Sequence, residues 1–250
     1  MEHQPALSYQ TKSRPLSGAV LVIAVLLAVL FAELAVGLTN QLPRAWFHDG
    51  RTYMDAASRW LAGGGFYSPY QLAGPYPVVE REVMYPPPVA LFLVPFAYLP
   101  SLVWLVLPLA ITGWVVWQQR PSMGQWAVIL ALLTLPIHYS TSFTLETLAN
   151  GGPTIWVLAL VALATRWPVF GPFVLLKPTL AVAPFALVGI RSRDWWLGLF
   201  LLGCLSAAVL PMWFDWFSVI RNAQMEQAPW TYALWNATFL CIPLVAAKRG

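Results

Sequence analysis

Charge is the scarcest property of this chain, since only 10% of its 250 residues are Asp, Glu, Lys or Arg. Soluble proteins carry about 25% charged residues, so this chain has too few to cover a surface that faces water. With only two cysteines and three histidines, a disulfide framework and a metal cluster are both disfavoured. Cys204 and Cys241 lie inside apolar runs, so we predict that both are small buried hydrophobic residues.

Hydrophobic residues are abundant instead, at 59% of the chain, and 14 Trp and 9 Tyr suit the two interfaces of a membrane. The net charge of +4 does not indicate nucleic acid as a partner, because the basic residues stand mostly at the ends of apolar runs. We therefore predict an all-α polytopic membrane protein with lipid as its main solvent.

The chain divides into four parts on this basis. A polar tail, residues 1–15, precedes an apolar run at 16–38, which is long enough to cross a bilayer and lacks a cleavage site. Residues 39–87 hold a large share of all the charge, and residues 88–250 are predicted to form a helical bundle. We expect about 7–8 membrane helices in all, from apolar runs of about 20 residues or shorter paired segments. Within the bundle the predicted apolar segments are 89–99, 101–117, 126–143, 155–165, 169–190, 195–213 and 230–247.

The distribution of basic residues predicts the topology. Cytoplasmic loops are enriched in Lys and Arg. With both termini in the cytoplasm of a multi-pass cell-membrane protein, the polar stretches 39–87, 144–154 and 215–229 fall outside. The basic residues that fall inside are Lys12, Arg14, Arg120, Arg166, Arg191, Arg193, Lys248 and Arg249.

The first outer loop begins with a predicted amphipathic helix at 48–61, whose apolar residues recur at helical spacing. Asp49 stands at its start and has two interpretations, a helix N-cap or a catalytic carboxylate. Arg51, Asp55 and Arg59 follow at intervals of four, which is typical of an exposed, salt-bridged face.

Two further motifs close this loop. Gly63-Gly64-Gly65 predicts a helix stop and a turn, followed by Tyr67. Tyr85-Pro86-Pro87-Pro88 predicts a stiff extended segment that starts the next helix. It either aims Tyr85 at a site or is a plain connector.

Lys177-Pro178 interrupts an apolar run, so we predict two short helices that meet at depth. A lysine at bilayer depth costs roughly 2.5–3.5 kcal/mol, so it should face a cavity or a partner charge, for which a phosphate is suited. The alternative is that Lys177 reaches the membrane interface. His138 has no second His or Cys near it in the sequence to complete a metal site.

In order and spacing, these motifs resemble glycosyltransferase family 87. They are an aspartate after the first membrane helix, Ala56-Ala57, the Gly63–65 turn, Tyr85-Pro86-Pro87 and Leu176-Lys177-Pro178. The resemblance covers about residues 16–195. Asn150-Gly151-Gly152-Pro153-Thr154 stands where the family often has Gly-Gln-x-Asn.

The resemblance implies a GT-C-type enzyme that transfers a sugar, expected to be mannose, from a polyprenyl-phosphate donor to a lipid or glycan acceptor outside the cell. Asp49 would be the general base, with inversion at the anomeric carbon. No cofactor and no metal is implied, and the partners are membrane lipids and the two substrates. The residues expected to bind substrate are His48, Arg51, Tyr53, Arg59, Tyr67, Tyr85, Glu146, Asn150 and Lys177.

Two other functions fit the same sequence. A membrane transporter or flippase would also need a broken helix with a buried cation, but it predicts a second broken helix that the sequence does not show. A non-catalytic relative would bind the donor without transferring its sugar.

Overall fold

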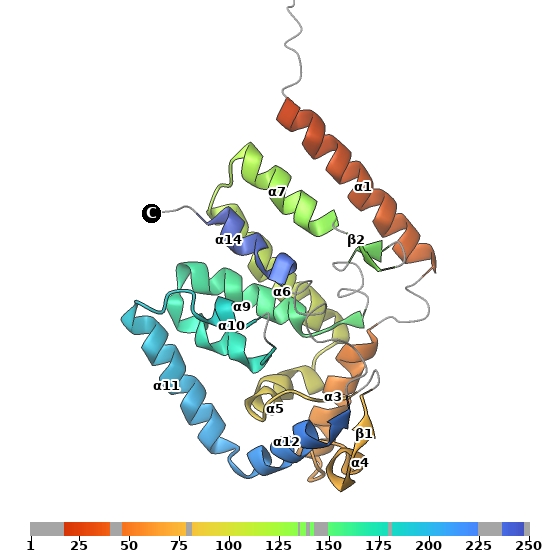
Figure 1. The fold of residues 1–250 in the computed structure, drawn as a ribbon, viewed down its shortest axis with the longest axis vertical. Coiled ribbons are helices and arrows are strands. Elements are labelled where there is room, and N and C mark those ends of the chain that lie inside the picture. The colour runs from red at the N-terminus through yellow and green to blue at the C-terminus, as the bar shows by residue number, and fades with distance from the viewer. Residues whose placement is uncertain are drawn as a thin grey trace, which may run out of the picture.

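A computed structural model of the chain describes residues 18–40, 47–78, 82–134, 136–138, 141–142, 150–179, 182–224 and 237–247. Of these residues, 74% are helical, so the prediction of a mostly helical protein is confirmed. The helices form an elongated assembly in which apolar helices occupy one end and the predicted outer loop the other (Figure 1).

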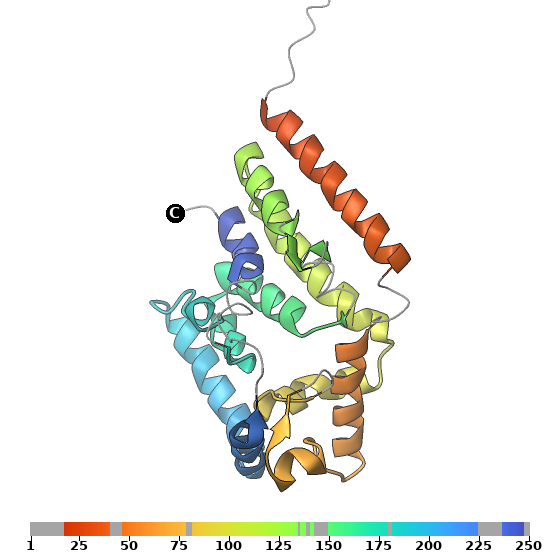
Figure 2. The same ribbon diagram turned by 45° about the vertical axis from the view of Figure 1, so that its right-hand side comes forward.

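The apolar end is built around two pairs of helices. α1 (Gly18–Asn40) lies alongside α7 (Met123–Thr134), and α6 (Ser101–Gln118) packs against α9 (Thr154–Arg166) (Figures 1 and 2). α14 (Ile242–Ala246) contacts α7, α9 and α6. Buried aliphatic residues of α6, α7, α9 and α14 form one hydrophobic core.

The other end contains the short elements of residues 47–97, most of which belong to the segment predicted to be the first outer loop. α3 (His48–Leu61) packs on α5 (Pro88–Leu93) and on the 3-10 helix η1 (Val94–Ala97). α4 (Pro69–Ala73) packs on a later helix, α12 (Pro211–Asn222). This brings residues more than 130 positions apart together: the hydroxyl of Tyr76 donates to the carbonyl oxygen of Val219 at 3.2 Å across 143 positions.

A parallel pair of short strands completes this connection. β1 (Tyr76–Pro77) pairs with β4 (Ala223–Gln224), with Tyr76 opposite Ala223. A second, antiparallel pair joins β2 (Pro136–His138) to β3 (Thr141–Ser142).

The expected count of 7–8 membrane helices is wrong for the described residues. By length and composition one helix, α6, can cross a membrane, and α11 (Arg193–Ala208) together with α12 would make a second if the two are one bent span. α1 is 23 residues long, and its apolar part is Val20–Ala32. The remaining described apolar helices have 10–17 residues, because glycines, prolines and polar residues divide the predicted runs.

Two predicted segments differ from the structure in ways that have local causes. The predicted helix at 126–143 ends at Thr134 and gives way to β2 and β3, because Pro136 and the Thr and Ser residues after it do not favour a helix. The segment 169–190 contains not two helices but η2 (Pro168–Phe170), η3 (Pro172–Leu176) and α10 (Ala183–Ala186), since prolines at 168, 172, 178 and 184 divide it.

The predicted span at 195–213 is not one straight helix, and the predicted polar loop at 215–229 is helical over residues 215–222. The chain bends by 91° between α11 and α12, at Val209 and Leu210, and stays helical to Asn222. Proline at the first position of α12 favours a new helix start over continuation of the old one. Cys204 lies exposed on α11 rather than buried, while Cys241 is half-buried.

Several predicted elements are confirmed. The amphipathic helix at 48–61 is α3, the apolar run 101–117 is α6, and the run 155–165 is α9, each within one residue at either end. Residues 225–236 and 248–249, which belong to the last predicted segments and their basic end, lie outside the described part of the chain, as does the polar tail.

Candidate functional site

The site is formed where the start of α3 meets the loop that precedes α9. Phe47, just before α3, has a left-handed backbone (φ 59°) and is buried. Its ring packs onto Gly50 and Gly151: a Cβ added to Gly50 would lie 2.5 Å from the ring, and one added to Gly151 would lie 2.7 Å from it. Glycine at both positions therefore allows the two backbones to approach each other around the Phe47 ring.

This contact places Asp49 beside Gly152. A Cβ added to Gly152 would lie 3.5 Å from Oδ2 of Asp49. The interpretation of Asp49 as the N-cap is wrong, because the N-cap residue is Phe47 and Asp49 lies within the first turn of α3. A carboxylate in that turn is stabilised by the helix dipole, and here its Oδ2 lies toward the facing loop.

The loop that faces Asp49 is held from two other directions. Trp104, on α6, donates its indole N–H to the carbonyl oxygen of Gly151 at 2.8 Å. Lys177, at the end of η3, donates its ammonium to the hydroxyl oxygen of Thr154. Asp49 thus lies beside Gly152 in the loop, and Lys177 bonds to Thr154 at the start of α9, two residues further along the chain.

Lys177 is the buried cation that the sequence predicts, with only 2% of its surface exposed. The chain turns at Lys177 (φ −114°, ψ 86°), and Pro178 follows as an exposed residue. Because desolvation of an ammonium is costly, a lysine at such a position requires polar partners, and Thr154 is one of them.

A cavity of about 30 Å³ lies between α3, α5, α6 and α9. This volume holds one or two water molecules. Five of the twelve lining residues are aromatic, and the buried indole N–H of Trp156 has no hydrogen-bond partner among the described residues. The residues around the cavity include Tyr53, Tyr85, Phe92, Trp104, Trp156 and Lys177.

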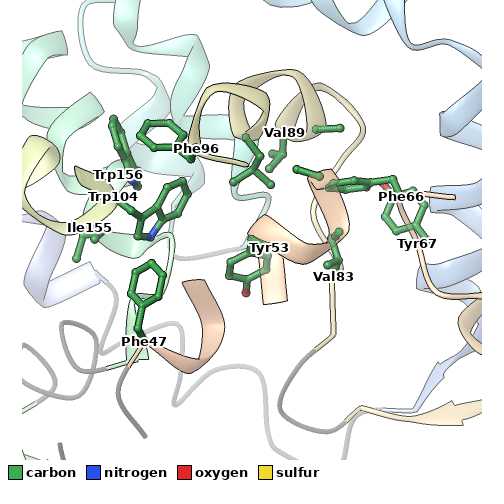
Figure 3. Packing of buried hydrophobic residues seen from close by; sticks show 14 of the residues in the cluster. Phe47, Tyr53, Phe66, Tyr67, Val83, Val89, Phe96, Trp104, Ile155 and Trp156 are labelled. Carbon is green, nitrogen blue, oxygen red and sulfur yellow. The ribbon is translucent and has the colours of Figure 1, made fainter. Parts of the chain in front are cut away.

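The rings near the cavity form a rigid cluster. Phe96 lies edge-on to Trp104 and to Trp156, with ring centroids 5.0 Å apart in both pairs (Figure 3). Tyr53 stands nearby on α3, between this cluster and Val83 in the view of Figure 3. Such edge-to-face contacts add about 0.5–1.5 kcal/mol each beyond the area they bury.

The backbone that carries Tyr85 is fixed at three successive carbonyls. The carbonyl oxygens of residues 83–85 accept hydrogen bonds from Gln71 at 3.3 Å, Trp216 at 3.0 Å and Tyr67 at 2.7 Å, in that order. The ring of Tyr85 then lies edge-on to Tyr53 at 5.3 Å. The extended segment before the prolines is therefore held in a fixed position beside the cavity.

Burial keeps the tyrosines of this framework protonated. Burial raises the pKa of Tyr67, and the charge of Asp215 raises it further. Burial also raises the pKa of Tyr76, although its hydrogen bond with Gln71 opposes the shift. Both hydroxyls are therefore hydrogen-bond donors at any physiological pH.

Not all of the predicted site residues gather at the cavity. Arg59 donates to the carbonyl oxygens of Gly65 and Phe66, both at 2.7 Å, and so stabilises the glycine turn. Arg51 is exposed, whereas His48 and Asn150 are half-buried, the first next to Asp49 in the chain and the second in the facing loop. Glu146 lies outside the described residues.

Sequence reasoning missed three residues that shape the site: Trp104, Thr154 and Trp156. The only signal for them was the Gly-Gly-Pro-Thr stretch at 151–154, which places a hydroxyl at the start of α9. Within the described ranges, no three His, Cys, Asp or Glu side chains are close enough to bind a metal ion.

Comparison of the chain with known protein families, with curated proteins and with solved structures gives no match, so the geometry above is the basis for any functional assignment.

Proposed function

We propose that this chain is a membrane glycosyltransferase of the GT-C type, which transfers a sugar from a polyprenyl phosphate to a lipid or glycan acceptor. The family resemblance favours mannose as the sugar. The observation that carries the proposal is that Asp49 lies beside Gly152 and Lys177 bonds to Thr154, two residues further along the same segment. A carboxylate and a buried cation near one short segment suit a reaction that moves a proton and releases a phosphate.

A membrane location is supported by composition and by the surface of the helices. Only 10% of residues are charged and the mean hydropathy is +0.65. Large hydrophobic side chains are exposed on α1, α6 and α11, among them Phe31 at 68%, Leu102 at 61% and Phe200 at 66%. Exposed apolar surface on several helices is compatible with lipid as solvent and costly in water.

The proposed reaction is a direct displacement. An acceptor hydroxyl oxygen bonds to the anomeric carbon while the bond from that carbon to the phosphate oxygen breaks, and the hydroxyl proton passes to Asp49. The lipid phosphate leaves with the electron pair, next to the Lys177 ammonium. One carboxylate acting on the acceptor alone predicts inversion of the anomeric carbon.

The size of the cavity sets a condition on this reaction. Ligand pockets usually measure about 300–1,000 Å³, whereas this cavity is about 30 Å³. A sugar phosphate therefore binds only after side chains on the wall, such as Tyr53 and Tyr85, move apart. The same observation favours a second candidate function, a non-catalytic relative of these enzymes.

The experiment compares Asp49→Asn with Asp55→Asn in the purified protein, supplied with labelled polyprenyl-phosphate mannose and a lipid extract. Both residues lie on α3, but Asp55 is exposed. Loss of a general base lowers the rate by about 10²–10⁴-fold, so Asp49→Asn should lose sugar transfer while Asp55→Asn keeps it.

Equal activity of the two variants would rule out Asp49 as the base. No transfer by the unsubstituted protein, together with retained donor binding, would favour the non-catalytic candidate. Uptake of the labelled donor into sealed vesicles without a covalent product would favour a transporter.

A further inference from the structure

Helix α12 has an apolar face that points away from the protein. Leu210, Phe214 and Phe217 recur at spacings of four and three, so they share one side of the helix. Their exposed fractions are 59%, 73% and 60%. Large hydrophobic residues that are exposed in a row on one helix mark a surface that is covered in the functional protein.

The opposite face of α12 is firmly attached. Val219 is fully buried, Trp216 donates to the carbonyl oxygen of Met84 at 3.0 Å, and Asn222 donates to that of Gln71 at 3.0 Å. The outward face is therefore held in a fixed orientation by the same contacts that position the segment carrying Tyr85.

The direction of α12 also matters. It runs at 91° to α11, which exposes large apolar side chains, such as Trp196 at 58% and Phe200 at 66%, after the exposed Arg193 and Asp194 at its start. If α11 stands along the bilayer normal, a helix at a right angle to it lies parallel to the membrane plane. The apolar surface of α11 then continues onto Leu210 at the bend.

Charge distinguishes the possible partners. Arg221 is exposed and follows Phe217 by four residues, so it extends the outward face, whereas Asp215 lies toward the flank nearer the protein, where its charge acts on Tyr67. A face that is apolar and carries an arginine at one end is complementary to acyl chains bordered by phosphates.

We infer that the outward face of α12 lies in the boundary between headgroups and acyl chains of an anionic phospholipid bilayer. This inference rests on the proposed membrane location and adds to it a second contact between bilayer and protein, next to the site. Helices of this kind sink their apolar face about 5–10 Å into that boundary. The depth of α12 in the membrane then sets the distance between the membrane surface and the segment that carries Tyr85.

The test uses single cysteines that carry an environment-sensitive fluorophore, in full-length protein with Cys204→Ser and Cys241→Ser, reconstituted in phosphatidylcholine–phosphatidylglycerol vesicles. Labels are placed at Phe214→Cys and Phe217→Cys. Asp215→Cys is the matched control on the flank of the same helix, and Val106→Cys on α6, 51% exposed, reports on membrane insertion itself. Quenching by lipid spin-labelled near the headgroup is compared with quenching by aqueous iodide.

We expect the labels at 214 and 217 to be quenched by the spin-labelled lipid about twofold more than the label at 215, and to be protected from iodide. If the label at residue 106 is quenched by the spin-labelled lipid while the labels at residues 214 and 217 are quenched by iodide, the inference about α12 is overturned and the membrane location stands. If 214 and 217 are shielded from both quenchers, a protein surface such as a second copy covers them, which also overturns it. Iodide quenching at Val106 would overturn the membrane location.

Discussion

The two ends of the molecule differ in the side chains that they bury and in those that they leave exposed. The outer-loop end, α3 to η1 together with α12, buries polar side chains and pairs them: Gln71 is completely buried, and its amide contacts Tyr76 and the carbonyl oxygen of Val83. The apolar end has helices such as α6 and α11 that leave large hydrophobic residues exposed. Specific hydrogen bonds order the first end, whereas close contacts between small residues and apolar side chains order the second.

The candidate site lies at the junction of these two ends. Asp49 and Tyr85 belong to the outer-loop end, and Lys177 and Thr154 to the apolar end. The proposed reaction suits such a junction. The lipid tail of the donor is stable against apolar helices, whereas the acceptor hydroxyl is stable near water. The comparison predicts that substitutions at either end destabilise the protein through different mechanisms.

The largest effect is expected at the apolar end for Gly198→Ala. A Cβ at Gly198 on α11 would overlap the carbonyl oxygen of Val169, so α11 must move away from η2. Overpacking of this kind costs about 3 kcal/mol, which thermal unfolding of the purified protein would measure. Gly203→Ala on the same helix is the control, since no atom of the described residues lies within 4 Å of a Cβ at this position. Equal unfolding temperatures for both variants would show that α11 does not pack as described.

At the outer-loop end, Gln71→Leu should lower the free energy of unfolding by about 2 kcal/mol, because the amide that pairs with Val83, Tyr76 and the backbone N–H of Ser68 is removed. Denaturant unfolding measures this loss. Gln224→Leu, with an exposed side chain on β4, should have little effect. A stabilised Gln71→Leu variant would contradict the view that hydrogen bonds order this end.

Tyr67→Phe should have a smaller effect on stability, about 1 kcal/mol, because one buried hydrogen bond to the carbonyl oxygen of Tyr85 is lost. Sugar transfer should fall more than stability, since the backbone of the segment that carries Tyr85 is held less firmly beside the cavity. Tyr98→Phe is the control, with 76% of Tyr98 exposed. Unchanged activity together with lowered stability would limit Tyr67 to a structural role.

The smallest effect concerns alkaline pH. Partial burial and the hydrogen bond to Glu82 raise the pKa of Tyr70 from 10.0 to about 12. The folded state thus holds this proton more tightly than the unfolded state, so the contribution of Tyr70 is complete below pH 10 and is lost as the pH rises toward 12. The unfolding temperature of Tyr70→Phe should therefore fall less between about pH 10 and about pH 12 than that of the unsubstituted protein. If the unfolding temperatures of the two proteins fall in parallel over this pH range, Tyr70 does not contribute to the pH dependence of stability.

Local patterns predicted those elements whose boundaries depend on neighbouring residues. α3 could be predicted from its helical spacing, and Gly63, with φ 84°, ends it as the glycine turn suggests. Lys177 could be identified as a buried cation, because a lysine inside an apolar run next to a proline either finds a polar partner at depth or reaches the interface. Composition indicated a mostly helical chain with an excess of apolar residues.

Contacts between distant segments could not be predicted in this way. The pairing of β1 with β4 and the three donors to the carbonyls of residues 83–85 join segments that are separated along the chain. The bend of 91° after α11 depends on a turn that many sequences can adopt, so spacing and composition do not reveal its angle.

Spacing and side-chain type identified α3, α6 and α9 and singled out Asp49 and Lys177, because both signals act over a few residues. The position of Asp49 beside Gly152 and the bond from Lys177 to Thr154 are visible only in the folded chain. The physical reason is that two glycines, Gly50 and Gly151, allow the backbones to meet around one buried ring, Phe47, and no local pattern reveals which glycines will meet.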